Sequence, residues 1–149
     1  MIRKVTSGPT PQQRRQSRKF ALQALYQWQM TKKPASQIEA EFVADNDFSK
    51  IDREYFSEVL RGVPAKIEEL DGHITEVLDR PLEQLTPIEL AILRMGAYEF
   101  MHRIDVPYKV IINEGVDLSK KFGANEAHRY VNGVLDKLAH KLRMAEVKR

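Results

Sequence analysis

Four cations gather where a predicted helix begins, at Arg14, Arg15, Arg18 and Lys19. Like charges repel, and cations near the positive N-terminal end of a helix are disfavoured by ~0.3–1 kcal/mol each. Because one guanidinium group can pair two phosphate oxygens, this placement favours a polyanion as the missing partner. A solvated, charged helix end is the alternative interpretation.

Two aromatic residues near a predicted helix junction could take part in recognition of nucleic acid. Phe122 precedes Gly123, and Tyr130 lies one turn into the next predicted helix. Bases of single-stranded RNA stack on exposed aromatic rings. The spacing of both residues favours packing in the core, and stacking stays open because basic residues flank them, namely Lys120, Lys121 and Arg129.

Charge is distributed unevenly along the 149 residues, although the net charge is only +3. Residues 1–19 hold six cations and no acid, and residues 137–149 hold five cations and one acid. An acidic body with two basic ends is typical of a protein that meets a polyanion such as nucleic acid. Basic termini that serve only solubility would produce the same pattern.

Signatures of catalysis are missing from the sequence. There is no cysteine, which excludes disulfides, a thiol nucleophile and a thiolate zinc site. No glycine-rich dinucleotide loop, phosphate-cradling loop, H-E-x-x-H or G-x-S-x-G motif occurs. We therefore expect a protein that is not an enzyme. The sequence also lacks a run of ~18 apolar residues, so we expect no membrane span and a cytoplasmic location.

A metal site has one weak candidate. Glu69, His73 and Glu76 would share one helix face, and two carboxylates with an imidazole can bind a metal ion. The Glu-x-x-His pairs of a di-metal helix bundle are missing. An exposed charged face is the favoured interpretation, and we expect neither a metal nor a cofactor.

Every strong apolar pattern is helical, so the sequence predicts an all-α helical bundle of about seven helices. They are expected over residues 14–30, 35–44, 52–63, 67–78, 88–101, 107–122 and 125–142. Asp52, Thr86 and Asn125 are predicted N-caps, and Gly62 with Pro64 predicts a break. We expect residues 1–13 to form a flexible basic arm, residues 14–142 one domain and residues 143–149 a frayed basic tail.

Two glycines, Gly115 and Gly133, lie inside predicted helices, where glycine costs roughly 1 kcal/mol relative to alanine. We expect a close approach of helices to compensate, with these two helices packed against each other. Gly123, by contrast, is placed to end a helix.

Four stretches carry a family resemblance. They are residues 14–26 (RRQSRKFALQALY), residues 93–99 (LRMGAYE), residues 105–114 (DVPYKVIINE), and FG at 122–123 followed by RYVNGVLD at 129–136. In this order they closely resemble the NusB family of transcription antitermination factors, over roughly residues 14–142. The resemblance implies an all-α fold of two three-helix sub-bundles packed together.

The resemblance also implies a non-catalytic RNA-binding function. NusB-like proteins pair with the tenth small-subunit ribosomal protein and bind the boxA element of nascent RNA, which is single-stranded. Within the RNA polymerase antitermination complex they promote transcription through terminators, chiefly on ribosomal RNA operons. The RNA-binding residues implied here are Arg14, Arg15, Arg18, Phe122, Glu126 and Tyr130, and the ribosomal-protein surface would include Tyr26 and Glu89.

The chain departs from the family pattern in places. Lys19 stands where the family often has Glu, Ile112 and Gly115 stand where Ala is common, and the N-terminal arm is longer.

A second candidate function is that of an accessory RNA-binding partner of a ribosomal RNA methyltransferase, because NusB-like domains occur fused to such enzymes. We expect no cofactor-binding domain here, since the sequence given ends at Arg149. The sequence is also compatible with a DNA-binding helical protein and with a homodimer that hides its RNA site.

Overall fold

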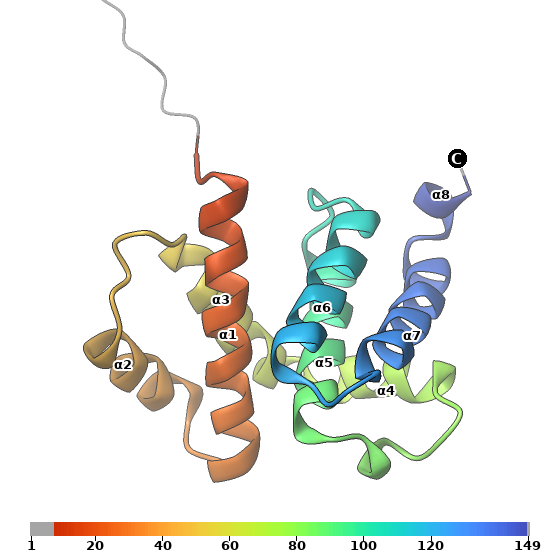
Figure 1. Ribbon diagram of the computed structural model, residues 1–149, viewed down its shortest axis with the longest axis horizontal. Coiled ribbons are helices and arrows are strands. Elements are labelled where there is room, and N and C mark those ends of the chain that lie inside the picture. The colour runs from red at the N-terminus through yellow and green to blue at the C-terminus, as the bar shows by residue number, and fades with distance from the viewer. Residues whose placement is uncertain (1–7, 149) are drawn as a thin grey trace, which may run out of the picture.

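The computed structural model describes residues 8–148 and consists of eight α-helices and one short 3₁₀ turn, with no strand in that range (Figure 1). The all-α prediction is confirmed. The helices are α1 (Pro11–Thr31), α2 (Ala35–Asp45), α3 (Arg53–Ala65), α4 (Ile67–Val77), α5 (Pro87–His102), α6 (Tyr108–Phe122), α7 (Ala127–Leu142) and α8 (Met144–Val147), with the 3₁₀ turn at Leu82–Gln84. Arg3 and Lys4 of the predicted arm lie outside the described residues.

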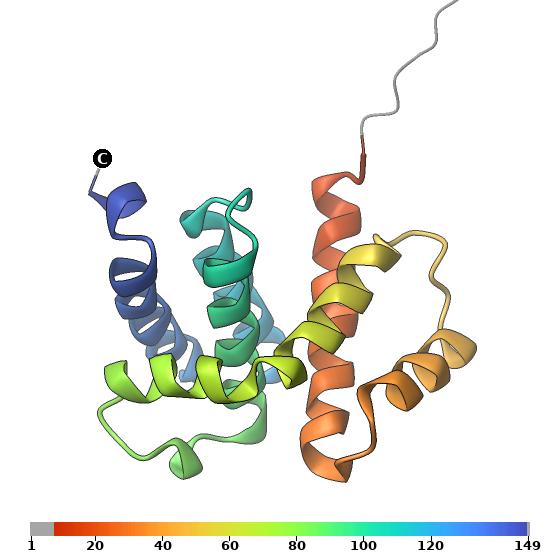
Figure 2. The same ribbon diagram turned by 180° about the vertical axis from the view of Figure 1, so that it is seen from behind.

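The helices form two groups that share one hydrophobic core. Helices α1, α2 and α3 pack together, and α5, α6 and α7 form the second group, with α4 against α5 and α7. Figure 2 shows α3 and α4 following one another across the back of both groups. The predicted break falls between them at Lys66, two residues after Pro64, whose ring nitrogen cannot donate a helical hydrogen bond. Packing of α1 against α5 joins the two groups.

Local cap signals set the starts of three helices, α1, α3 and α5. Asp52 and Thr86 accept hydrogen bonds at the starts of α3 and α5, as predicted. Helix α1 begins earlier than predicted, at Pro11, because Thr10 and Gln13 form a capping box there. The flexible arm expected over residues 1–13 is therefore wrong for its last three residues, which are helical.

The corner between α6 and α7 differs from the prediction. Helix α6 ends at Phe122 and is followed by Gly123, as expected. The N-cap of α7 is Glu126 and not Asn125, and no side chain caps this helix. Glu126 has a φ of 69°, in the left-handed region that only a few non-glycine residues adopt.

The C-terminal residues are docked, so the expectation of a frayed tail over residues 143–149 is wrong for Arg143 to Val147. Arg143 is buried and donates hydrogen bonds to the carbonyl oxygens of Glu99, Phe100, Arg103 and Val106. Glu146 accepts a hydrogen bond from the backbone nitrogen of Tyr108, at the start of α6. The tail therefore supplies partners to backbone groups that two helix ends leave unpaired.

The glycine predictions are confirmed in part. Helices α6 and α7 do pack together, and a Cβ at Gly115 would lie 2.6 Å from Leu135 of α7. Gly133 faces open space, so it does not support the contact between the two helices. Among the helices that the structure describes, none combines the length and apolar character needed to cross a membrane.

Candidate nucleic-acid interface

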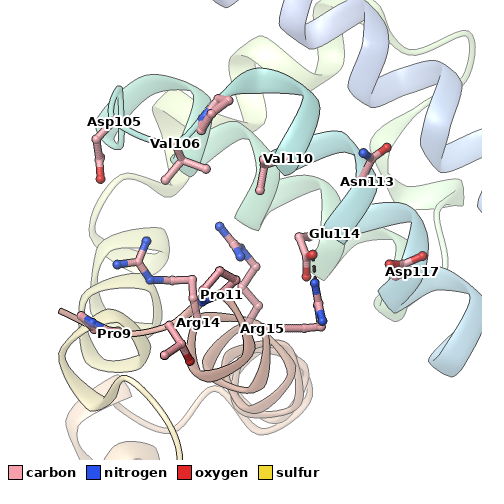
Figure 3. A pocket seen from close by; sticks show the side chains of 13 residues that line it. Pro9, Pro11, Arg14, Arg15, Asp105, Val106, Val110, Asn113, Glu114 and Asp117 are labelled. Atoms are coloured by element: carbon pink, nitrogen blue, oxygen red, sulfur yellow. Dashed lines mark hydrogen bonds and ion pairs between the residues drawn. The ribbon is translucent and has the colours of Figure 1, made fainter. Parts of the chain in front are cut away.

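The N-terminal end of α1 faces the α5–α6 loop and the first turns of α6 across a hollow of about 580 Å³, here called the arginine hollow. Figure 3 shows Arg14 and Arg15 on the α1 side, with Val110 and Glu114 opposite them on α6. The loop adds Asp105, and a hydrogen bond from Arg103 lowers the pKa of this carboxyl below its usual value. Both signs of charge therefore line the hollow.

Arg15 is the most accessible of the predicted arginines, with 47% of its side chain exposed. Its Nε donates to Glu114 Oε2 at 3.2 Å, and its Nη1 donates to Gln12 Oε1 at 3.2 Å. Glu114 keeps only 12% of its side chain exposed, but the half-exposed Arg15 leaves this pair open to solvent, and ion pairs screened by solvent contribute only ~0–1 kcal/mol. A phosphate group can therefore replace Glu114 as the partner of Arg15 at little cost.

Arg14 is held more firmly than Arg15. Its Nε donates to Asp52 Oδ2 at 3.2 Å, and its guanidinium carbon lies 4.0 Å from the centre of the Tyr55 ring. Arg103 approaches the same ring at 4.7 Å. Arg14 keeps 23% of its side chain exposed toward the hollow. Its orientation is thus fixed before any ligand arrives.

Arg18 does not fit the expectation of an RNA contact, because it is buried with only 3% of its surface exposed. Its guanidinium group donates two bonds to Glu99 Oε2, at 2.8 and 3.0 Å, and the Tyr55 hydroxyl donates to the same oxygen. Burial raises the pKa of the Glu99 carboxyl, and the Arg18 cation opposes that shift. Arg18 therefore joins α1 to α5 and supports the Tyr55 ring beneath Arg14.

Phe122 and Tyr130 are both half-buried and pack against the core. This environment is intermediate between the two interpretations of the sequence, full burial in the core and exposure for base stacking. The Tyr130 hydroxyl donates to Asp79 at 3.3 Å, and the Arg80 guanidinium carbon lies 4.2 Å from the ring centre. Glu126 is exposed and pairs with Arg129 at 2.7 Å. Stacking of bases at this corner stays a prediction.

The predicted RNA-binding residues do not converge on one point. Arg15 pairs with Glu114 in the middle of α6, whereas Phe122 ends that helix. Phe122 follows Glu114 by eight residues, which separates these two points by about 12 Å along the helix axis. The structure therefore predicts an extended interface along α1 and α6.

The predicted partner residues lie at the other end of α1. Tyr26 is 38% exposed and lines a hollow between α1 and α2 together with Met30 and Phe42. Glu89 belongs to the capping box of α5. Gln29 Nε2 donates to the carbonyl oxygen of Pro87 at 2.9 Å, which brings this end of α1 to the start of α5.

The candidate metal ligands do not gather. Glu69 pairs with His102 at 3.2 Å, and Glu76 pairs with Lys141. Within residues 8–148, no group of three or more histidine, aspartate or glutamate side chains could hold a metal ion.

Sequence reasoning missed Asp52, Tyr55, Glu99 and Glu114 as the side chains that hold the arginines. Asp52 was visible only as a helix cap, and Glu114 only as part of a family string. Each of these four residues contacts an arginine that lies at least 37 positions away in the chain. No local spacing encodes such a pairing, so a single sequence carried no signal for it.

Two joined helical groups, with the accessible Arg14 and Arg15 in a hollow between α1 and α6, define an all-α class of protein that can offer cations to a polyanion. The sequence profile of the NusB family matches residues 15–140, and the chain belongs to the NusB family. The transcription antitermination protein NusB of Pseudomonas entomophila (strain L48) is 58% identical over 135 residues, which cover 91% of this chain and 81% of that protein. NusB of Marinobacter nauticus is 53% identical over 143 residues, covering 96% and 90%.

Solved structures agree with the family assignment. A crystal structure of antitermination factors NusB and NusE in complex with dsRNA superposes with a TM-score of 0.78 at 25% identity, covering 89% of this chain and 99% of that one. NusB of T. maritima gives a TM-score of 0.76 at 25% identity, covering 89% and 93%. The family resemblance is therefore confirmed, and transcription antitermination is the function of this protein.

Proposed function

We propose that the protein is a non-catalytic, cytoplasmic antitermination factor that binds boxA-type nascent RNA together with the tenth small-subunit ribosomal protein. In this role it promotes processive transcription of ribosomal RNA operons. The observation that carries the proposal is the half-exposed Arg15 guanidinium at the open side of the arginine hollow. A solved relative with NusE and RNA supports both kinds of partner.

The first test reverses one charge. Arg15→Glu removes the most accessible guanidinium group and places a carboxylate beside Glu114, so we expect RNA affinity to fall at least tenfold, with the helix content unchanged. Lys66→Glu is the matched control, because Lys66 is an exposed cation between α3 and α4 and does not line the arginine hollow. Equal affinity of the wild-type protein and the Arg15 variant in a filter-binding titration would refute the assignment.

The second test concerns the partner and the form of the RNA. The affinity for boxA-type single-stranded RNA should rise when the ribosomal protein is added, because the pair offers a larger surface to one strand. The solved relative contains dsRNA, so a duplex of the same sequence is the necessary comparison. Tighter binding of the duplex, or an affinity that does not respond to the ribosomal protein, would contradict the proposal.

A further inference from the structure

We propose that a second hollow between α1 and α6 continues the RNA path, with Lys19, Lys120 and Lys121 binding backbone phosphates between Arg15 and Phe122. This inference rests on the proposed function and adds binding residues to it. The hollow, here called the lysine hollow, has a volume of about 220 Å³ and is lined by these three lysines together with Arg15, Glu114 and Asp117.

The lysine hollow adjoins the arginine hollow. Arg15, Glu114 and Asp117 line both of them, and the ion pair between Arg15 and Glu114 stands where they meet (Figure 3). Lys121 directly precedes Phe122 in the chain. The two hollows thus form one groove that leads from the helix start of α1 to the α6–α7 corner.

The charge in the lysine hollow is not balanced. None of the three lysines forms an ion pair with another residue in the part of the chain that the structure describes. Glu114 is engaged by Arg15, and Asp117 is the one remaining carboxylate among the lining residues. Three cations facing one free carboxylate leave room for an anion.

Helix stability accounts for only part of this pattern. Lys120 and Lys121 lie in the last turn of α6, where cations are favoured by the helix dipole. Lys19 lies in the first half of α1, after three arginines, and shares the hollow with both other lysines. A carboxylate at position 19 would pair with them, whereas a lysine repels them. Bound phosphate removes that repulsion.

The size and spacing of the groove suit a nucleotide backbone. The lysine hollow is less than half as large as the arginine hollow. Its three lysines suit a phosphate group, because each can bind a backbone phosphate oxygen. Lys19 follows Arg15 by four residues, which places it about 6 Å further along the α1 axis. A strand held by Arg15 would therefore meet Lys19 next, and then the end of α6.

The test measures how RNA binding depends on salt. Each phosphate contact to a single strand contributes about 0.7 to the slope of log K against log salt. In the double variant Lys19→Gln, Lys120→Gln we expect the magnitude of this negative slope to decrease by about 1.4, because two phosphate contacts are lost. The probe is boxA-type single-stranded RNA with the ribosomal protein present. Lys66→Gln, which lies outside both hollows, is the control and should leave the slope unchanged.

The outcomes separate this inference from the proposed function. If wild-type protein binds RNA and Arg15→Glu does not, an unchanged slope in the lysine variant overturns the inference alone. An equal change with Lys66→Gln also overturns it, because the effect would then come from net charge. If the wild-type protein does not bind RNA, both proposals fail. Circular dichroism of each variant checks that the substitutions leave the helices intact.

Discussion

Three arginines within five residues of α1 have three different environments. Arg18 is buried against Glu99, Arg14 is fixed by Asp52 and Tyr55, and Arg15 is half-exposed and pairs with Glu114. The free-energy cost of replacing the present partner of each arginine by a phosphate group rises in the order Arg15, Arg14, Arg18. Neighbouring positions in a sequence therefore do not share a role merely because they share a charge.

The pair of Arg15 with Glu114 leads to a prediction. Glu114→Gln removes a carboxylate that competes with phosphate for Arg15, so RNA affinity should rise about two- to fivefold, in line with the ~0–1 kcal/mol of an exposed ion pair. Fluorescence anisotropy with labelled RNA measures it. Glu41→Gln, which breaks the exposed pair with Lys33, is the control. Weaker binding by Glu114→Gln would show that Glu114 positions Arg15 and does not compete for it.

Tyr98 gives a prediction for alkaline pH. Burial and a hydrogen bond to Glu58 raise the pKa of Tyr98 from 10.0 to about 12. Below pH 10 the phenol is neutral in the folded and the unfolded chain, and its contribution to stability is complete. As the pH rises toward about 12, only the unfolded chain releases the proton, so the free energy of unfolding falls.

The measurement is urea denaturation across this pH range. Tyr98→Phe should lose less stability than the wild-type protein between pH 10 and about 12, because it has no phenol at this site. Tyr26→Phe removes an exposed phenol that donates to no other described residue, and it should follow the wild-type profile. Identical profiles for all three proteins would contradict the role of Tyr98.

At the residue scale the sequence identified which side chains could bind a ligand or cap a helix better than it predicted whether each of them is exposed or buried. The cation cluster, the aromatic pair and the caps Asp52 and Thr86 were all identified from local patterns. Arg18 could not be recognised as buried, because its partner Glu99 lies 81 positions away on another helix. Burial of a charge depends on that partner, which a helical periodicity does not reveal.

At the scale of helices, two glycines inside neighbouring helices are expected to respond in opposite ways to alanine. In α3, a Cβ at Gly62 would lie 2.4–2.7 Å from atoms of the Tyr98 ring, which is 7% exposed and cannot move freely. We expect Gly62→Ala to destabilise the protein by about 1–3 kcal/mol, because the core is overpacked.

Gly72 of α4 provides the matched control. Nothing lies within 4 Å of the position its Cβ would take, and the residue is exposed. Gly72→Ala should therefore stabilise the protein by about 0.5–1 kcal/mol through helix propensity alone. Thermal denaturation of both variants measures the effects. Shifts of the melting temperature in the same direction would contradict the close approach of α3 to α5.

The helices themselves were largely predictable because their signals are local. Apolar spacing and capping boxes lie within a few residues, so the ranges from α1 to α7 agree closely with those expected. Helix α8 was missed because its four residues carry no pattern of their own. It is held by contacts of Arg143 and Glu146 with distant backbone groups, and such contacts appear only in three dimensions.

At the scale of the whole molecule, the buried pair of Arg18 and Glu99 ties the two helical groups together. Glu99→Gln should destabilise the protein by about 3–5 kcal/mol, because it leaves the Arg18 cation buried without a counter-charge. Urea denaturation measures the loss. The double variant Arg18→Met, Glu99→Leu should recover part of it, since an apolar pair needs no counter-charge, although the buried Tyr55 hydroxyl loses its acceptor.

An exposed carboxylate serves as the control for this prediction. Glu69→Gln, which breaks the surface pair with His102, should change the free energy of unfolding by no more than about 0.5 kcal/mol. A similarly small effect of Glu99→Gln would mean that the two groups are joined by apolar packing of α1 on α5 alone.

The arrangement of two groups was implied by the family resemblance and not by the periodicity. Periodicity shows that a helix has an apolar face, but it does not show which other helix covers that face. The order in which α1 packs on α5, and α4 on α7, depends on the combined shape of all the helices. This level of organisation could therefore be predicted only through similarity to proteins of known fold.

The docked tail has a mechanical consequence. Arg143 holds the carbonyl oxygens of Arg103 and Val106, and both residues belong to the α5–α6 loop that forms one wall of the arginine hollow. The stiffness of that wall is thus set by side chains that do not line the hollow. Proteolytic removal of the residues from Arg143 onward would delete these hydrogen bonds and make the loop more mobile. Every arginine of α1 would remain in place.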